Sequence, residues 1–177
     1  MLKNSKITIE GNQLKSIYAV YVIELTHQNE KYYYIGQTGD AHYIAARPPF
    51  SRISGHLENT KRSTQNQIYK FIINKLDIHS PADVSDYTRE DKARVETFLS
   101  ESHITMHIYP LIEFNHMLAE DEHKNRRQHV LEFEKQVIHL FQKADKNLIN
   151  RSRHLPKQTD GAIFPEKYEV VKTDFRL

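Results

Sequence analysis

The chain has 177 residues, with 25 lysines and arginines, 23 acidic residues, 11 histidines and no cysteine. This length suits one domain that buries a core without disulfides. Without cysteine, the chain cannot form a disulfide scaffold, a cysteine nucleophile or a thiolate zinc site. The first residues are too polar for a signal peptide, and no apolar run approaches the roughly 18 residues of a membrane span. We therefore expect a soluble cytoplasmic protein with no membrane association.

Basic residues gather in two parts of the chain. Residues 41–75 hold six lysines and arginines against one acid, and residues 135–157 hold six against one. Residues 76–102 invert this balance, with seven acids against three bases. Two basic segments that meet in the fold would present a positive surface to a polyanion such as nucleic acid. Solvated helix faces are the alternative explanation, so charge alone does not establish a nucleic-acid partner.

The first half of the chain predicts two strands followed by helices. Aromatic and β-branched runs at 18–25 and 32–35 predict a hairpin with a loop of about six residues. Two prolines at 48–49 mark the start of a helix, because proline is tolerated in the first turn. A second helix fits 64–76, where the apolar residues share one face.

The second half predicts two further helices separated by a strand. Thr88 and Asp91 have the spacing of a capping box, which marks a helix N-terminus. Alternating apolar residues at 103–109 predict a third strand, and a long helix is expected over about 116–144. This order describes an α+β domain with a small, mostly antiparallel three-stranded sheet flanked by helices.

Glu134 is the most informative residue of the long helix. On a helical wheel at about 100° per residue, the apolar residues of 130–144 cover an arc from about 280° through 0° to about 100°. Glu134 lies at about 40°, inside that arc, whereas Glu132 and His139 are expected on the solvent face. A carboxylate on an apolar face needs a cation, a metal or a functional role, because burying it unpaired is costly. A buried ion pair with an arginine is the alternative explanation.

Other candidate residues are weaker when taken singly. Arg52 and His56 are four residues apart and so lie on the same side of the predicted first helix. A basic surface stripe would give the same spacing. Three consecutive tyrosines at 32–34 are also good strand formers. The histidines have no spacing typical of zinc ligands, and we expect those of the long helix to face solvent, namely His116, His123 and His129.

The order of these residues resembles the GIY-YIG nuclease superfamily. Tyr34-Ile35-Gly36, followed by Gln37-Thr38, matches the second motif of that superfamily. Ala19-Val20-Tyr21 stands where the first motif, Gly-Ile-Tyr, is expected, with alanine in place of glycine.

Three later positions extend the resemblance over roughly residues 18–151. Arg52 and His56 match an Arg-x-x-x-His motif on the first helix, and Glu134 matches a helix glutamate that binds metal. Asn150, at the end of Lys146-Asn147-Leu148-Ile149-Asn150, matches a terminal asparagine.

The resemblance implies a metal-dependent endonuclease that hydrolyses DNA, of the small restriction type. Glu134 would hold Mg²⁺ or Mn²⁺, because one carboxylate with waters and phosphate oxygens suits a hard cation. The catalytic residues implied are Tyr21, Tyr34, Arg52, His56, Glu134 and Asn150. The residues expected to contact nucleic acid are Gln37, Thr38, Arg47, Lys61, Arg62, Arg151 and Arg153.

Several alternatives stay open at this point. Arg47 competes with Arg52 as the catalytic arginine, and Tyr21 competes with Tyr34 as the base. RNA is an alternative substrate, and cutting both strands requires a homodimer or one site acting twice. Ala19 favours a different class of function, a nucleic-acid-binding or regulatory protein with a compromised site.

The domain organisation expected is a single nuclease-like domain with additions. Its parts are an N-terminal arm at 1–17, the domain at 18–151 with insertions at 41–50 and 77–102, and a C-terminal extension at 152–177.

Overall fold

The computed structural model describes residues 8–57, 66–78, 87–150 and 162–177. The expected α+β class is confirmed: three antiparallel strands in the order β2-β1-β3 are flanked by helices. The elements in chain order are η1 (Gly11–Leu14), β1 (Ile17–His27), β2 (Glu30–Gln37), α1 (Pro49–Leu57), α2 (Gln67–Lys75), α3 (Arg89–Ser100), β3 (Ser102–Glu113), α4 (Glu120–Lys143) and α5 (Pro165–Phe175). The short helix η1 and the helix α5 are additions to the predicted order.

The hairpin between β1 and β2 is tighter than predicted. His27 pairs with Glu30, so the turn contains only Gln28 and Asn29. Both turn residues have positive φ, 47° and 69°. Two left-handed residues are what a type I′ turn requires, and asparagine tolerates that conformation better than most residues. The expected six-residue loop is therefore wrong, because the strands continue into its polar residues.

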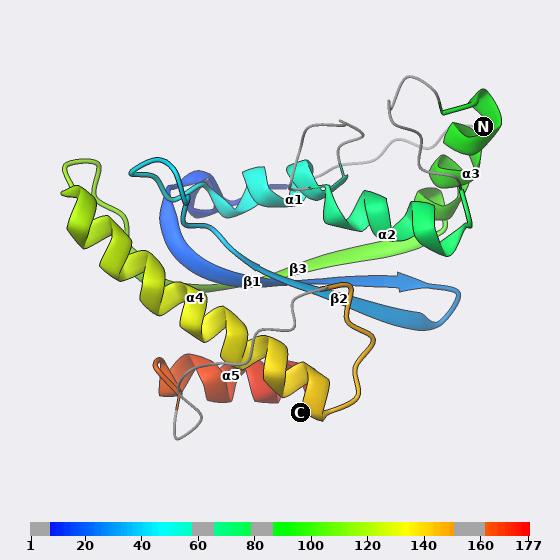
Figure 1. Ribbon diagram of the computed structural model, residues 1–177. Coiled ribbons are helices and arrows are strands. Elements are labelled where there is room, and N and C mark those ends of the chain that lie inside the picture. The colour runs from blue at the N-terminus through cyan, green and yellow to red at the C-terminus, as the bar shows by residue number, and fades with distance from the viewer. Residues whose placement is uncertain (1–7, 58–65, 79–86, 151–161) are drawn as a thin grey trace.

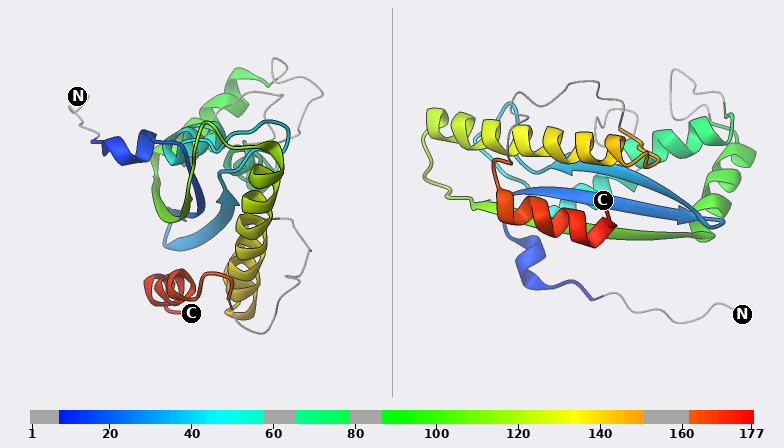
Figure 2. Two further views of the ribbon diagram at one scale, coloured as in Figure 1. Left: turned by 90° about the vertical axis from the view of Figure 1, so that its left-hand side faces the viewer. Right: turned by 90° about the horizontal axis from the view of Figure 1, so that it is seen from below.

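Helices cover both faces of the sheet (Figure 1). Helices α1, α2 and α3 lie on one face, which we call the α1 face, and α4 and α5 lie on the other, the α4 face. Seen from the α4 side, in the right-hand view of Figure 2, α4 and α5 lie side by side in front of the strands. Because side chains alternate along a strand, β1 supplies residues to two separate cores.

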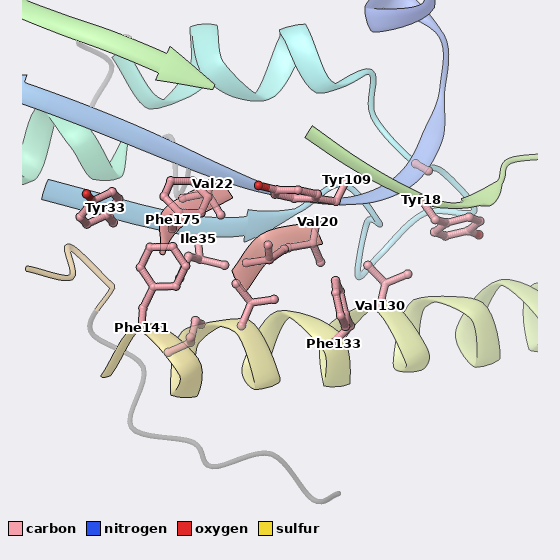
Figure 3. Close-up of a cluster of buried hydrophobic side chains, with 14 of the residues drawn as sticks. Tyr18, Val20, Val22, Tyr33, Ile35, Tyr109, Val130, Phe133, Phe141 and Phe175 are labelled. Atoms are coloured by element: carbon pink, nitrogen blue, oxygen red, sulfur yellow. The ribbon is translucent and has the colours of Figure 1, made fainter. Parts of the chain in front are cut away.

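The core on the α4 face joins β1, β2, α4 and α5. Val20 and Val22 from β1 point toward Phe133 and its neighbours on α4 (Figure 3). Phe175 of α5 packs edge-on against Phe141 of α4, with ring centroids 4.9 Å apart. The C-terminal helix is thus part of the core rather than a separate appendage.

The core on the α1 face is built by α2 and α3. Ile68 and Ile72 of α2 and Phe98 of α3 pack against Ile23 and Leu25 of β1. The predicted capping box is confirmed, since the Thr88 hydroxyl accepts a hydrogen bond from the Asp91 amide and the Asp91 carboxylate accepts one from the Thr88 amide. These contacts leave α1 over the opposite end of the sheet from the hairpin, where it packs on β1 and η1.

Two side chains of α4 that were expected in solvent are buried. His123 is 4% exposed, because its ring lies between the Tyr18 hydroxyl and the backbone carbonyl of Asp40. Glu132 is 5% exposed and lies 3.5 Å from Lys135. On the same side of α4, one turn from Glu132, the Ile163 amide donates to the Gln136 side chain. Both predictions were wrong because contacts distant in sequence decide this burial.

The helices within the described residues include none with the length and apolar character needed to cross a membrane.

Candidate active site

Tyr21 and Tyr34 lie side by side on the α1 face of the sheet. In the β1–β2 register, Tyr21 pairs with Gly36 and Ile23 pairs with Tyr34, so the two tyrosines point to the same side. Their ring centroids are 6.4 Å apart. A Cβ at Gly36 would lie 2.6 Å from the Tyr21 Cζ. Glycine at this position therefore makes room for the Tyr21 ring.

Helix α1 brings Arg52 and His56 onto Tyr21. The helix begins at Pro49, and the four-residue spacing stacks Arg52 and His56 one turn apart. The Tyr21 hydroxyl lies 2.8 Å from His56 Nε2, and Arg52 Nε donates to the same hydroxyl over 3.4 Å. Arginine can only donate, so the Tyr21 oxygen accepts from Arg52 and keeps its own proton for the histidine nitrogen.

The two tyrosines differ in how readily they ionise. Burial raises the pKa of Tyr21 to about 12, against the opposing effect of the Arg52 guanidinium and its hydrogen bond. Burial also raises the pKa of Tyr34, and the neighbouring Tyr21 and Glu134 add to this effect. Tyr34 contacts His56 through its ring, with centroids 4.4 Å apart. Of the two, Tyr21 is the better placed to exchange a proton, since its oxygen touches a histidine nitrogen.

Glu134 reaches this cluster from α4. The helix packs on β1 and on the edge strand β2, and the charge of Glu134 affects the pKa of both tyrosines. Burial raises the pKa of Glu134 to about 7, although the positive charges of Arg52, Arg127 and Lys135 oppose this rise. Glu134 as a whole residue is nevertheless partly exposed to solvent. The carboxylate that the helical wheel placed on the apolar stripe thus lies close to cations.

Asn150 supports the site through the backbone of β2. Its side-chain amide donates to the Ile35 carbonyl and accepts from the Ile35 amide, both over 2.7 Å. The chain before it forms a short parallel bridge between Leu148 and Tyr33 at the open edge of β2. Both polar groups of the Asn150 side chain are occupied, so this residue positions the strand between Tyr34 and Gly36.

Gln37 and Thr38, expected to contact nucleic acid, are buried and bonded to backbone. The Gln37 amide bonds to Gly39 at both of its ends. The Thr38 hydroxyl donates to the Ile17 carbonyl and accepts from the Ala19 amide. Their side chains therefore shape the end of β2, and in this arrangement neither offers a free donor to a substrate.

Ala19 fits its position without disturbing the strand. It is fully buried, and its carbonyl accepts a hydrogen bond of 3.1 Å from the Thr38 amide. The departure from the glycine of the first motif therefore leaves the backbone contact between β1 and the end of β2 intact.

Arg47 and Arg52 have different partners in the structure. Arg47 pairs with Asp40 over 3.0 Å, within the loop that joins β2 to α1. Arg52, in contrast, donates to Tyr21. Of the two arginines, the geometry thus favours Arg52 as the one that contacts the tyrosine hydroxyl. The remaining residues expected to contact nucleic acid lie outside the described residues, namely Lys61, Arg62, Arg151 and Arg153.

Two residues of α4 near the site were missed by the sequence reasoning. His123 bonds Tyr18 and the Asp40 carbonyl, and Arg127 affects the charge of Glu134. Extending the helical wheel toward the N-terminus places His123 at about 20° and Arg127 at about 60°, on the same stripe as Glu134. That signal was present in the sequence, because both polar residues fall inside the apolar arc.

A divalent cation would have one carboxylate here. Among the described ranges, no group of three or more acidic or histidine side chains gathers to hold a metal. Glu134 is partly accessible and stands among arginines, which repel a bare cation. One carboxylate leaves most of the coordination sphere to water and substrate oxygens, as Mg²⁺ sites with phosphates commonly do. A divalent cation at Glu134 would therefore depend on water and substrate oxygens for most of its ligands.

Comparisons with protein-family models, with curated proteins and with solved structures found no significant match to this chain.

Proposed function

We propose that this protein is a metal-dependent endonuclease that hydrolyses phosphodiester bonds in DNA, of the small restriction type. The observation that carries the proposal is the hydrogen-bonded cluster of Tyr21, His56 and Arg52, with Glu134 near enough for its charge to affect the pKa of Tyr21. It combines a proton acceptor, a fixed cation and a metal-binding oxygen. Each of these groups can lower the barrier to phosphodiester hydrolysis.

Tyr21 and His56 would activate the attacking water together. Tyr21 Oη takes a proton from water while its own proton passes to His56 Nε2, 2.8 Å away. This transfer never requires a free phenolate, which the raised pKa of Tyr21 makes scarce at neutral pH. His56 thus acts as the final proton acceptor, and Tyr21 is the group that contacts the attacking water.

Arg52, together with a metal ion held by Glu134, would neutralise the negative charge of the phosphate. The Arg52 guanidinium beside Tyr21 binds a phosphoryl oxygen and stabilises the charge that develops on it. Glu134 would hold Mg²⁺ or Mn²⁺, which supplies charge neutralisation at the phosphate and the leaving oxygen. The fixed position of β2, set by Asn150, keeps both tyrosines in register with these groups.

We further propose a cytoplasmic enzyme that binds DNA without membrane association. Cutting both strands would then require a homodimer or one site acting on each strand in turn. RNA is a second substrate to test, because the cluster contacts only what the two nucleic acids share, their phosphates.

Incubation of supercoiled plasmid, phage DNA and a matched RNA with Mg²⁺ or Mn²⁺ tests the proposal. We expect discrete DNA fragments that disappear with EDTA and with Glu134→Gln. Glu169→Gln, an exposed carboxylate of α5 that pairs with Lys172, is the matched control and should cleave as the wild type does. Absence of cleavage with both metals, together with DNA binding that survives Glu134→Gln, would overturn the enzyme proposal in favour of a binding or regulatory protein.

A further inference from the structure

Arg127 lies on the stripe of α4 that leads to Glu134. Seven residues separate the two, which places them on one side of the helix about 10 Å apart along its axis. One turn before Arg127, His123 bonds the Asp40 carbonyl in the loop that follows β2. The stripe therefore runs along the edge of the sheet from this loop toward Glu134.

The aliphatic part of the Arg127 side chain is held in place by Gly39. Arg127 Cγ lies only 3.2 Å from where a Cβ at residue 39 would stand. A larger residue at position 39 would displace the arginine. The stem of Arg127 therefore packs against the backbone of this loop at Gly39.

The guanidinium of Arg127 carries an unused donor. Its Nε is shielded from solvent and, within the described part of the chain, has no hydrogen-bond partner. A buried donor without an acceptor is unfavourable, and arginine has no neutral form at ordinary pH that would relieve it. An acceptor oxygen that came within hydrogen-bond distance of Nε would satisfy this donor.

The neighbouring cations are already engaged. Arg47 pairs with Asp40, Arg126 bonds Glu122 and the Glu113 carbonyl, and Arg52 donates to Tyr21. Of these arginines, Arg127 is the one that has a buried nitrogen donor, Nε, without a hydrogen-bond acceptor among the described residues. The positive charge of Arg127 also opposes the rise in the pKa of Glu134, so the two groups are near enough to interact electrostatically.

We propose that Arg127 binds a backbone phosphate of the nucleic acid, next to the phosphate held by Arg52. This inference rests on the proposed function. Arg52 and Arg127, whose charges both act on Glu134, would hold successive phosphates of one strand, and the planar guanidinium suits the bidentate contact that phosphate offers. Arg127 therefore fixes the register of the strand and takes no part in proton transfer.

DNA binding by the cleavage-deficient Glu134→Gln protein, measured by fluorescence anisotropy over a range of salt concentrations, tests the inference. Adding Arg127→Ala should weaken binding about tenfold and lower the slope of log K against log salt by about one, the change expected when one phosphate contact is lost. Adding Arg127→Lys should keep the slope and lose part of the affinity, because the charge remains without the planar fork.

Adding Arg126→Ala instead is the matched control, since that neighbouring arginine is bonded to protein groups and should leave the slope unchanged. Unfolding temperatures of all variants show that each is folded. An unchanged slope in a folded Arg127→Ala protein overturns the inference, even if wild-type DNA cleavage upholds the endonuclease. A lowered slope in a protein that never cleaves upholds the Arg127 contact and overturns the endonuclease.

Discussion

Two influences act in opposite directions on the ionisation of the Tyr21 hydroxyl. Arg52 favours the phenolate, whereas burial favours the neutral phenol and raises the pKa to about 12. His56 resolves this conflict, because a neutral imidazole nitrogen 2.8 Å away can take the proton. Proton transfer at Tyr21 therefore depends on the pair that it forms with His56.

Tyr21→Phe tests this pair. Removing the hydroxyl should lower the cleavage rate by roughly 100-fold or more, the usual contribution of a general base, while the unfolding temperature stays near that of the wild type. Tyr43→Phe, an exposed tyrosine of the loop after β2, is the control and should cleave normally. Equal rates for Tyr21→Phe and the wild type would remove Tyr21 from the mechanism.

Glu134 predicts a pH dependence of stability. Its pKa is about 7 in the folded protein, above the ordinary value of 4.5, so the folded state binds the proton more tightly. Stability from this group is fully present below pH 4.5 and is lost as the pH rises through 7.

Glu134→Gln should therefore stabilise the metal-free protein at pH 8, by on the order of 2 kcal/mol, and should have little effect at pH 4. Urea unfolding in EDTA at both pH values measures the difference. A variant less stable than the wild type at pH 8 would show that the carboxylate is favourably paired instead.

At the scale of the elements, the contact between β1 and β2 decides where Tyr21 points. Gly36 leaves the space that the Tyr21 ring occupies, while Asn150 ties the β2 backbone on the other side. A short edge strand is thus fixed from both directions. A substitution at Gly36 or at Asn150 should therefore affect the site by shifting β2 or the Tyr21 ring beside it.

Gly36→Ala should disturb the site more than the fold. The added methyl group meets the Tyr21 ring, which must move away from His56 and Arg52. We expect cleavage to fall by roughly 100-fold, as for loss of the base, and stability to fall by about 1–3 kcal/mol from overpacking. Gly11→Ala is the matched control, because nothing lies within 4 Å of a Cβ there. Similar cleavage by the two variants would contradict this role for Gly36.

Asn150→Ala should loosen the edge of β2. It removes two hydrogen bonds to Ile35, and we expect unfolding to become easier by about 1–3 kcal/mol. The rate should fall as well, because Tyr34 and Gly36 flank the released residue. Asn147→Ala, which loses one exposed hydrogen bond to Lys31, should cost clearly less. Equal stability losses in the two variants, measured by urea unfolding, would argue against a special role for Asn150.

At the scale of the whole molecule, local patterns predicted most of the fold. The strands of the hairpin, the capping box at Thr88 and the long helix all follow from residue types and spacing. The tight turn at Gln28 and Asn29 was missed, because it lacks the glycine that usually marks such turns. Burial of Glu132 and His123 was missed because it depends on contacts with distant parts of the chain, Tyr18 among them.

Part of the candidate site was also predictable from residue types and their spacing. The sequence placed Glu134 on the apolar stripe of its helix, and the spacing of Arg52 and His56 put both on one side of α1. Residue spacing could not predict the tertiary contacts of the site. These are the contact of His56 on α1 with Tyr21 on β1, and the packing of α4 against β2. The choice between Arg47 and Arg52 likewise needed the ion pair of Arg47 with Asp40.

The most direct test of the central claim is the single-turnover rate of DNA strand cleavage as a function of Mg²⁺ concentration, for the wild type and for Glu134→Gln. We predict that the wild-type rate rises with Mg²⁺ to a plateau and is abolished by EDTA. Glu134→Gln should be slower by at least about 100-fold while remaining folded, as expected for the loss of a group that stabilises the transition state. Cleavage that persists in EDTA, or a Glu134→Gln protein as fast as the wild type, would contradict the account.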